Sequence, residues 1–405
     1  MRRLLVVDPD NPACRALTFA AKAAGIEVCS VGHHEAGSSG GDLLTDFADE
    51  GMFVSDVTRF CKETCVDAVV TGNEFLTPLV TLVCDQLSLP SNVAEQAYAA
   101  RNKVAMSHRL ACSGVLTPRT FVITNAAELE RLLTSGRVGL PFVIKPADNA
   151  GSNGVTVVLN ADDRAEAYRY AAGPETVVPF GMTKDRRILV QEYIEGAEFS
   201  VESITQHGIP HHVCITRKLT STGAHRVELG HAVPAGVDEA AERLILHTAG
   251  QAIKAVGIEN GPSHTEVKLD SQGRCVVIEI AGRVGGAPIA DLVQLAHGVD
   301  MFRACVDVAL GIPAAVKRSR NDYATARFFT APSQGKIASV TGLPLQDVTV
   351  PVVRLRRQVG DAVGDNRGNG CRVGHFIVTG SDRSVIERRA ESLSSQILVE
   401  ITEAG

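Results

Sequence analysis

The 405-residue sequence contains no tryptophan, few aromatic residues (4%) and no excess of basic residues, since 40 Lys and Arg stand against 46 Asp and Glu. Basic tracts interleaved with aromatic residues, which are typical of nucleic-acid-binding surfaces, are absent. No apolar run approaches the roughly 20 residues that span a bilayer, and the N-terminal MRRLLVVDPD has too short an apolar run for a signal peptide. The sequence therefore predicts a cytoplasmic protein without a nucleic-acid or membrane partner.

The ten cysteines include no CxxC pair, so the sequence indicates neither a zinc site nor a disulfide framework. Cys61 and Cys65 have a spacing that fits one face of a single helix. We predict reduced, mostly buried thiols. With 45% hydrophobic residues the chain can bury a sizeable core, and its length allows two or three domains.

Strand and helix patterns alternate in the first 95 residues. Strands are predicted at 4–7, 26–31 and 67–71, and helices at 13–24, 53–64 and 78–87. This alternation predicts a doubly wound α/β fold with a parallel sheet. No GxGxxG motif follows the first strand, which argues against dinucleotide binding. The loop TGNEFLTP follows a strand, at the edge where open α/β sheets bind ligands, so Asn73 and Glu74 could contact a substrate; a plain turn is an equal alternative.

The middle of the chain contains a glycine-rich segment, DNAGSNG, between two predicted strands. Strands are predicted at 120–124, 141–145, 155–159 and 187–194, and helices at 94–110, 126–134 and 164–171. Small residues from Asn149 to Gly154 would let backbone N–H groups approach phosphates. The segment is not a Walker loop, because Lys145 precedes the glycines. A lysine at the end of a buried strand nevertheless strengthens the prediction of a phosphate site.

The segment GPSHTEVKLDSQGRCVVIEIAGRVGGAP, residues 261–288, predicts a β-hairpin with its turn at SQG. Glu266 and Glu279 lie among apolar neighbours on the two arms, where an unpaired carboxylate is costly to bury. Mg²⁺ would neutralise them, since it prefers one or two carboxylates together with phosphate oxygens. Arg283 follows with a fork of donors suited to phosphate or carboxylate. The alternative is an edge hairpin whose acids are solvated.

Beyond residue 320 the pattern becomes β-rich. Strands are predicted at 324–329, 336–340, 348–355 and 374–379, followed by a helix at 384–398. The segment DAVGDNRGNGCRVG is interpreted as turns without a role in phosphate binding. His231 and His264 could contact a substrate, although an isolated histidine is more often structural.

Taken together, these motifs resemble the ATP-grasp superfamily over about residues 95–310. Within it, SHTEVKLD, IEIAGRVGG and DLVQLAHGVDMFRACVDVALG look most like the amino-acid ligases, which join two amino acids, or a carboxylic acid to an amine. The resemblance implies an N-terminal Rossmann-like (pre-ATP-grasp) domain at 1–95. It also implies an ATP-grasp domain at 96–315, with the small lobe at about 117–193, and a β-rich C-terminal subdomain at 316–405.

The resemblance also implies roles for individual residues. The residues implied to bind ATP are Lys103, Lys145, Gly151, Ser152, Gly154, Glu192, Tyr193, Ile194 and Glu198. Mg²⁺, or Mn²⁺ in its place, would be bound by Glu266 and Glu279. Lys145 and Arg283 would be catalytic, with Arg283 stabilising the transferred phosphoryl group or an acyl phosphate. The residues predicted to contact substrate are Glu74, His231, His264, Arg283 and Gly286.

The implied reaction joins a small carboxylic acid to an amine through an acyl phosphate and releases ADP and phosphate. The sequence does not identify the acid or the amine, and it leaves a homodimer open. The family commonly has an asparagine two residues after the second metal-binding glutamate, whereas this sequence has Ala281. Two glutamates with water could suffice, or the metal site could be degenerate. The alternatives are a carboxylase or purine-type ligase of the same superfamily, and a non-catalytic ATP-binding regulatory protein.

Overall fold

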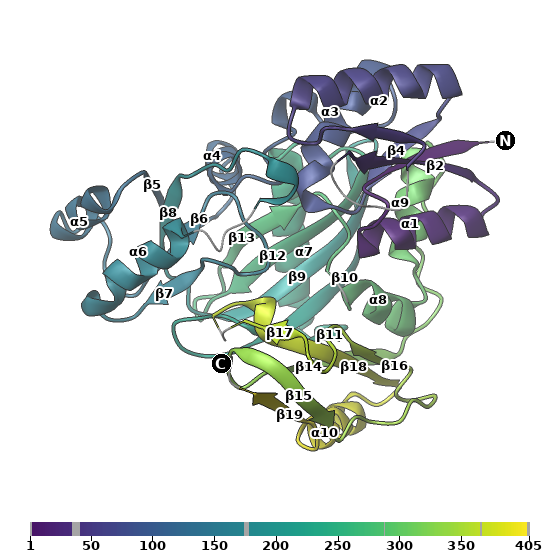
Figure 1. Cartoon of the computed structure of the whole chain (residues 1–405). Helices are drawn as coiled ribbons and strands as arrows, with labels where there is room; N and C mark the ends of the chain where they lie inside the picture. Colours follow the sequence, from purple (N-terminus) through teal and green to yellow (C-terminus); the bar gives the residue numbers. More distant parts are fainter. Residues whose placement is uncertain (1, 35–40, 174–177, 287, 365–366, 403–405) are drawn as a thin grey trace.

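The computed structural model describes residues 2–34, 41–173, 178–286, 288–364 and 367–402. Figure 1 shows a large central sheet with the N-terminal domain at the top and the small lobe at the left. The C-terminal elements lie at the bottom of the same view. Among the described residues, no helix is both long and apolar enough to cross a bilayer.

The N-terminal domain contains a four-stranded parallel sheet in the order β3-β2-β1-β4. Its strands are β1 (Arg3–Val7), β2 (Glu27–His33), β3 (Leu43–Thr45) and β4 (Ala68–Thr71), and its helices are α1 (Pro12–Ala23), α2 (Glu50–Thr64) and α3 (Thr77–Leu87). The parallel fold and the predicted elements are confirmed; only β3 was not predicted. Cys61 is in α2, but Cys65 follows the helix in a left-handed conformation, so the two do not share a helix face. All ten cysteines are free thiols, and most are buried, as predicted.

The small lobe is a four-stranded antiparallel sheet in the order β5-β8-β6-β7. Its elements are β5 (Thr120–Ile123), α5 (Ala126–Thr134), β6 (Phe142–Pro146), β7 (Thr156–Val158), α6 (Arg164–Ala172) and β8 (Ile188–Glu192). Short 3₁₀ turns lie at Ala161–Asp163 and Pro179–Gly181. The core is formed by apolar residues of the sheet and both helices, including Phe142, Ile144 and Leu129.

The predicted single helix at 94–110 is wrong. The segment begins with a 3₁₀ turn at Ala94–Gln96, and helix α4 (Lys103–Cys112) starts only after a break. Asn102 caps α4 by accepting hydrogen bonds from the N–H groups of Val104 and Ala105. The N–H of Lys103 donates to the carbonyl of Ala147 at 2.9 Å instead of continuing the earlier turn. The break therefore places Lys103 at a helix N-terminus against the end of β6.

The large lobe contains an eight-stranded antiparallel sheet in the order β13-β12-β9-β10-β11-β14-β18-β16. Its strands are β9 (Ala197–Gln206), β10 (Ile209–Thr220), β11 (Glu228–Val233), β12 (Gly261–Leu269), β13 (Cys275–Ala281), β14 (Tyr323–Thr330), β16 (Val352–Leu355) and β18 (Arg372–Gly380). The helices that pack on it are α7 (Glu239–Ala255), α8 (Ile289–His297) and α9 (Met301–Ala309). One core cluster joins α9 to α1 and β1, so this helix also supports the N-terminal domain.

The C-terminal region is less separate than the sequence suggested. Strands β14, β16 and β18 extend the sheet of the large lobe, while β15 (Gly335–Thr341), β17 (Ala362–Val363) and β19 (Leu398–Thr402) form a small sheet of their own. Helix α10 (Arg383–Ser394) packs on β14 and β18. It ends before residue 398, and the chain then forms β19, which was not predicted. Strand β16 starts at Val352, later than the predicted residue 348. The domain boundaries themselves stay a prediction.

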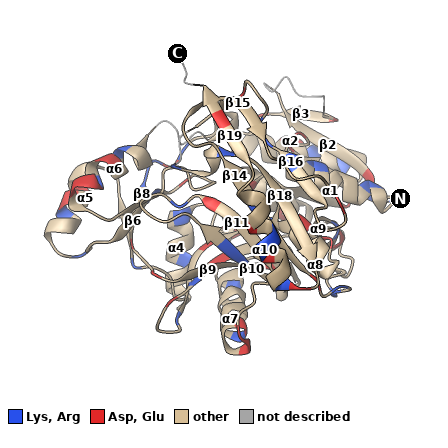
Figure 2. Cartoon of the chain, turned by 90° about the horizontal axis from the view of Figure 1, so that it is seen from below, with Lys and Arg blue, Asp and Glu red and all other residues tan. Residues whose placement is uncertain are grey.

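Figure 2 shows basic and acidic residues interspersed over the elements seen from below. Neither sign dominates that view, in line with the nearly balanced composition.

Candidate active site

One cavity of about 570 Å³ lies among the small lobe, the large sheet and the loop that follows β4. It is lined by nearly every residue for which the sequence predicted a role. Two exceptions are Gly154 and Asn73, which are not part of the lining. The side chain of Asn73 caps the 3₁₀ turn Glu74–Leu76 and donates to Asp8 at 2.8 Å, so its role is structural. The cavity thus joins motifs that lie more than 200 residues apart in the chain.

Glu266 and Glu279 face each other across the predicted hairpin. They are directly paired in the register of β12 and β13, with a bulge next to Glu266. Strand β13 is the edge of the sheet, but both acids are half-buried and line the cavity, so the alternative of solvated acids is wrong. Lys103 lies 3.1 Å from Glu279, and Lys218 forms an ion pair with Glu266. Burial alone would raise the pKa of Glu266, but Lys218 and His264 hold it well below its usual range.

Lys218, on β10, is a charged hub that the sequence reasoning missed. Its buried Nζ lies 2.9 Å from Glu198 and 3.2 Å from Glu228, in addition to its pair with Glu266. Burial would lower the pKa of Lys218, but the three carboxylates raise it well above its usual value. Its strand position gave a signal, because Lys218 shares a face with the buried Thr216.

Another carboxylate, that of Glu202, contacts the metal-binding candidate Glu266 indirectly, through the ring of His264. Glu202 is fully buried and lies 3.0 Å from Nδ1 of His264, whose Nε2 is 3.3 Å from Glu266. Burial opposes protonation of His264, but Glu202 and Glu266 raise its pKa to about 9. A Cβ at Gly285 would approach Glu202 to 2.6 Å, so glycine is needed there for the pair to pack. Both nitrogens of His264 are engaged by carboxylates, and the ring holds Glu266 in place.

Two lysines reach the cavity from the small-lobe side. Lys103 donates to the carbonyl of Asn149 at 2.7 Å, which connects it to the glycine-rich loop. Lys145, at the end of β6, is buried, and this burial lowers its pKa to about 8, with Glu279 opposing the shift and Lys103 adding to it. Two neighbouring ammonium groups favour an anion between them.

The glycine-rich loop contacts the C-terminal region. Gly151 and Ser152 have positive φ angles of 69° and 60°, a conformation in which glycine is free of strain. The N–H of Asn369 donates to the carbonyl of Gly151 at 3.3 Å, and the Asn369 side chain donates to Glu228 at 3.0 Å. The segment interpreted only as turns therefore contributes Asn369, Gly370 and Arg372 to the cavity, a correction that local sequence could not supply. Residues 365 and 366 of that segment lie outside the described residues.

Hydrogen bonds from other segments hold the predicted hinge residues after β8 in place. The carboxylate of Glu192 accepts from the N–H of Arg119 at 2.9 Å. The hydroxyl of Tyr193 accepts from Arg226 at 2.8 Å, and the carbonyl of Ile194 accepts from Lys268 at 3.1 Å. All three hinge residues line the cavity. Sequence reasoning missed Arg226 and Lys268, which are distant in the chain.

Glu74 and Arg283, both predicted to contact substrate, are paired with each other. Nε and Nη2 of Arg283 lie 2.8 and 2.6 Å from the same Glu74 oxygen. Burial would raise the pKa of Glu74, but Arg283 and Arg101 lower it. This ion pair joins the N-terminal domain to the large lobe, and both of its residues line the cavity, as does Gly286.

His231 and Ala281 line the same cavity. His231 is buried on β11 with its Nε2 3.9 Å from Glu228, and burial lowers its pKa to about 4, so the ring is neutral at pH 7. Ala281 ends β13 and is paired in register with His264. Its side chain offers no oxygen at the position where the resemblance suggested asparagine.

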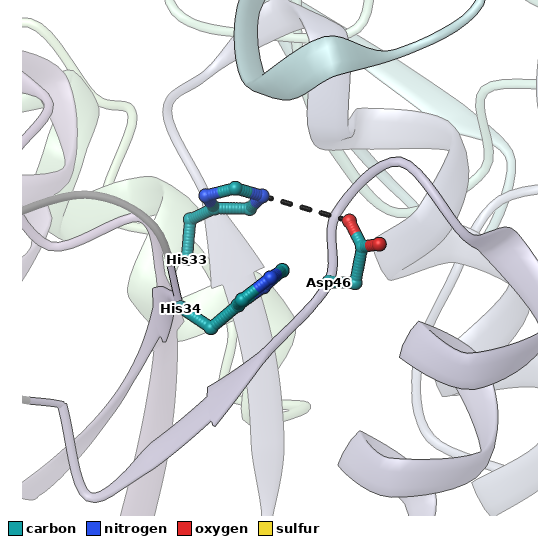
Figure 3. Close-up of side chains that lie close together, drawn as sticks. All are labelled: His33, His34 and Asp46. Atoms are coloured by element: carbon teal, nitrogen blue, oxygen red, sulfur yellow. Dashed lines mark ion pairs between the residues drawn. The ribbon is translucent and has the colours of Figure 1, made fainter.

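A separate group of potential metal ligands lies in the N-terminal domain. Figure 3 shows His33, His34 and Asp46 side by side, with Nε2 of His33 3.5 Å from Asp46. The ring of His33 also packs against the rings of Phe47 and of Phe180 in the small lobe, with a distance of 5.3 Å between ring centroids in each case. None of these residues lines the cavity, and the aromatic packing joins the two domains.

Comparison with known proteins finds two family models that match parts of this chain. Residues 138–291 match the family described as ATP-grasp domain, and residues 327–402 match L-amino acid ligase C-terminal domain 2. Alanine–anticapsin ligase of Bacillus subtilis is 27% identical over 273 residues, which cover 64% of this chain and 57% of that protein. Dapdiamide A synthase of Enterobacter agglomerans is 31% identical over 227 residues, which cover 55% of this chain and 51% of that protein. The aligned parts thus span just over half the length of these two relatives.

Solved structures share the fold over the whole chain. The L-amino acid ligase of Bacillus licheniformis matches with a TM-score of 0.82 at 22% identity, covering 100% of this chain and 99% of that one. Phosphoribosylglycinamide synthetase of Anaerococcus prevotii matches with a TM-score of 0.71 at 20% identity, covering 99% and 100%.

Proposed function

We propose that this chain, which belongs to the ATP-grasp superfamily, joins an amino acid or other carboxylic acid to an amine or second amino acid through an acyl phosphate, releasing ADP and phosphate. The observation that carries the proposal is the facing pair Glu266 and Glu279 in one cavity with Lys103, Lys145 and Arg283. Opposed acids and convergent basic groups are what phosphoryl transfer to a carboxylate requires.

The residues present fit a divalent cation and a nucleotide. Glu266 and Glu279 offer carboxylate oxygens of the kind that Mg²⁺ prefers, and Mn²⁺ accepts the same ligands. Bound Mg²⁺ would supply positive charge at the phosphate oxygens. Lys145 lies buried with its pKa lowered, a cost of burial that an anionic phosphate would offset. The hinge residues Glu192, Tyr193 and Ile194 line the same cavity, so a purine ring would lie against them.

Each residue would act by charge and position. Lys103 and Lys145 would hold the phosphates, and the loop from Asn149 would exclude water, because an acyl phosphate hydrolyses readily. Arg283 would neutralise negative charge on the transferred group, while Glu74 fixes the direction of its guanidinium. His264 would keep Glu266 oriented through its bond to Glu202.

Sequence relatives support the amino-acid ligase branch over the other activities of the superfamily. The fold alone does not separate the branches, since purine-type and biotin-carboxylase structures match it with TM-scores near 0.7. The L-amino acid ligase C-terminal match and the curated ligases point to amide formation. The non-catalytic alternative rests on Ala281 alone.

The test is to measure ADP and phosphate release with Mg²⁺, ATP and pairs drawn from all amino acids, with hydroxylamine as a trap for an activated acid. We expect equal amounts of ADP, phosphate and amide product, or a hydroxamate when hydroxylamine replaces the amine. Glu279→Gln should abolish release, whereas Glu391→Gln, an exposed acid on α10, should not change it.

Other outcomes identify the alternatives. AMP and pyrophosphate would contradict the acyl-phosphate route. Turnover that requires bicarbonate or a phosphoribosyl amine would favour a carboxylase or purine-type ligase. ATP binding without release for any pair would favour a regulatory protein.

A further inference from the structure

Three potential metal ligands, His33, His34 and Asp46, form a group outside the cavity, which we call the histidine cluster (Figure 3). Each side chain offers one ligand atom, and these atoms all lie within 4.8 Å of one another. In the described part of the chain, no other three His, Cys, Asp or Glu side chains meet this criterion. The cluster contains no cysteine, so it is not the kind of zinc site that the cysteine spacing argued against.

Parallel strand pairing brings the cluster together. His33 is the last residue of β2 and His34 follows it, while Asp46 directly follows the end of β3. The register pairs His33 with Thr45, so the two strands end at the same edge of the sheet. The carboxyl ends of the strands are the edge at which open α/β sheets bind ligands. The three side chains therefore meet at a place where the fold favours a site.

The spacing of the cluster suits two ligands of one cation better than a direct hydrogen bond. Nε2 of His33 lies 3.5 Å from Oδ1 of Asp46, beyond the range of about 2.7–3.2 Å that is typical of N–H···O hydrogen bonds. Atoms bound to Zn²⁺ at about 2.0–2.1 Å in tetrahedral directions lie about 3.3–3.4 Å apart. The separation of His33 and Asp46 is close to this value. The other separations, within 4.8 Å, would shorten with a small shift of the exposed ring of His34.

Backbone groups orient Asp46 and His34. The N–H of Ala48 donates to Oδ1 of Asp46 at 2.8 Å, and this bond, together with His33, lowers the pKa of Asp46 and keeps the carboxylate ionised. Nδ1 of His34 lies 3.4 Å from the carbonyl of Thr45. Metal-bound histidines commonly contact a backbone carbonyl through their second ring nitrogen, which orients the ring.

The donor set selects one class of cation. Two imidazole nitrogens and one carboxylate are ligands that Zn²⁺ and similar transition metals prefer, whereas Mg²⁺ prefers oxygen ligands throughout. His33 is buried, but His34 is exposed and the Asp46 side chain is 32% exposed. A cation can therefore enter from the solvent and complete its coordination with water.

Metal binding at the cluster would act on the junction between two domains. The ring of His33 packs against Phe180 of the small lobe, and Phe180 packs against Phe47 with 4.9 Å between ring centroids. Phe47 directly follows Asp46 in the chain. A cation held by His33 and Asp46 would thus restrain both of the side chains on which Phe180 packs.

We propose that the histidine cluster binds a divalent transition metal of the Zn²⁺ class and thereby stabilises the contact between the N-terminal domain and the small lobe. The inference goes beyond the proposed function and does not depend on it. None of the three side chains lines the cavity in which ATP and Mg²⁺ are proposed to bind.

The test titrates Zn²⁺, without ATP, into full-length protein that has been kept reduced and freed of metal with EDTA. Calorimetry measures the binding, and thermal unfolding measures the stabilisation. His34→Gln removes one ligand, and Asp46→Asn removes the negative charge of another while keeping the oxygen that accepts from Ala48. His33 is kept, because its ring also packs in the junction. His247→Gln, which replaces an exposed histidine on α7, is the matched control.

We expect the wild type and His247→Gln to bind one Zn²⁺ that His34→Gln and Asp46→Asn bind at least about tenfold more weakly. This Zn²⁺ should raise the Tm of the first two proteins more than that of the other two, because a ligand bound only by the folded state stabilises it. Mg²⁺ should not distinguish the four proteins. X-ray absorption of wild type with one equivalent of Zn²⁺ should show nitrogen and oxygen ligands at about 2.0–2.1 Å and no sulfur at about 2.3 Å.

Several results would overturn the proposal. A wild type that binds no Zn²⁺, or equal binding by all four proteins, would do so, and sulfur ligands in the absorption spectrum would place the ion on cysteines instead. Binding that is lost in His34→Gln and Asp46→Asn without any difference in Tm would refute the stabilising role. Glu279→Gln leaves the cluster intact and should retain this Zn²⁺ even without turnover, so failure of the ligase proposal remains distinguishable.

Discussion

Replacing Lys218 with methionine removes a buried charge while keeping most of the side-chain volume. Three carboxylates surround the ammonium group, two of them at 2.9 and 3.2 Å. At such separations each pair is worth about 5 kcal/mol with an effective dielectric constant near 20. The cost of burying the charges and the repulsion among the acids offset most of this sum. Breaking such a buried pair typically costs about 3–5 kcal/mol.

The pKa of Glu228 gives a second estimate. Burial raises it, but Lys218, His231 and Arg372 lower it from 4.5 to about 2. A shift of this size corresponds to roughly 3 kcal/mol. Because the folded pKa is below the unfolded value, this stability is present above pH 4.5 and is lost as the pH falls through about 2. Both estimates therefore predict that Lys218→Met lowers the free energy of unfolding by about 3–5 kcal/mol at pH 7.

Urea denaturation of the wild type and of Lys218→Met, at pH 7 and at pH 5, measures this loss of unfolding free energy. Without Lys218, burial raises the pKa values of the acids around it, so these acids become protonated as the pH falls to 5. The difference in unfolding free energy between wild type and Lys218→Met should therefore narrow at pH 5. Mg²⁺ should also narrow it by replacing the lost positive charge. Lys268→Met is the matched control, because its Nζ donates to a carbonyl, and it should cost only about 1 kcal/mol. A Lys218→Met loss no larger than the control, and independent of pH, would refute the reasoning.

Three further predictions concern the phosphate and metal sites. Lys145→Ala and Glu279→Ala should each lower kcat/KM at least about a hundredfold, because each removes a charge partner of the transition state; near-normal steady-state kinetics would mean that the site is misplaced. Since burial lowers the pKa of Lys145 to about 8 and bound phosphates would raise it again, ATP should bind more weakly as the pH rises above 8 and take up a proton near pH 8.5. Titration calorimetry in two buffers of different ionisation enthalpy should detect this uptake, and Lys145→Met should abolish it. Ala281→Asn should leave kcat within roughly tenfold, because a carbonyl would replace one water among six ligands; a silent wild type that gains turnover with asparagine would instead indicate a decayed metal site.

Local sequence determined the elements that need no distant partner. The hairpin follows from β-branched arms and a glycine turn, whereas a bulge next to Glu266, which shifts the register by one residue, sets Glu266 opposite Glu279. Lys145 could be placed at a strand end because strand length and the following glycines are local signals. The parallel N-terminal sheet followed from alternating strand and helix periodicity. These features depend on residues within a few positions of one another.

Only the tertiary structure decided which side chains meet. Periodicity shows that Lys218 faces the buried side of its strand, but not that Glu198, Glu228 and Glu266 from three other strands surround it. The break before Lys103 depends on a hydrogen bond to Ala147, more than forty residues away, which overrides local helix propensity.

The C-terminal part of the site shows the same limit. Arg372 and the glycine-rich segment around it have ordinary turn chemistry, and their place in the cavity arises because β18 joins the large sheet beside β14. Glu74 and Arg283 are a further example. The local sequence around each is also compatible with a solvent-exposed charge, and only the packing of the two domains pairs them. The sequence by itself thus predicted which side chains are candidates for binding phosphate and metal, whereas the sheet order decided their ion-pair partners and the C-terminal lining of the cavity. The physical reason is that neighbours across a sheet are set by strand pairing, and local sequence encodes the facing of a strand but not the identity of its neighbours.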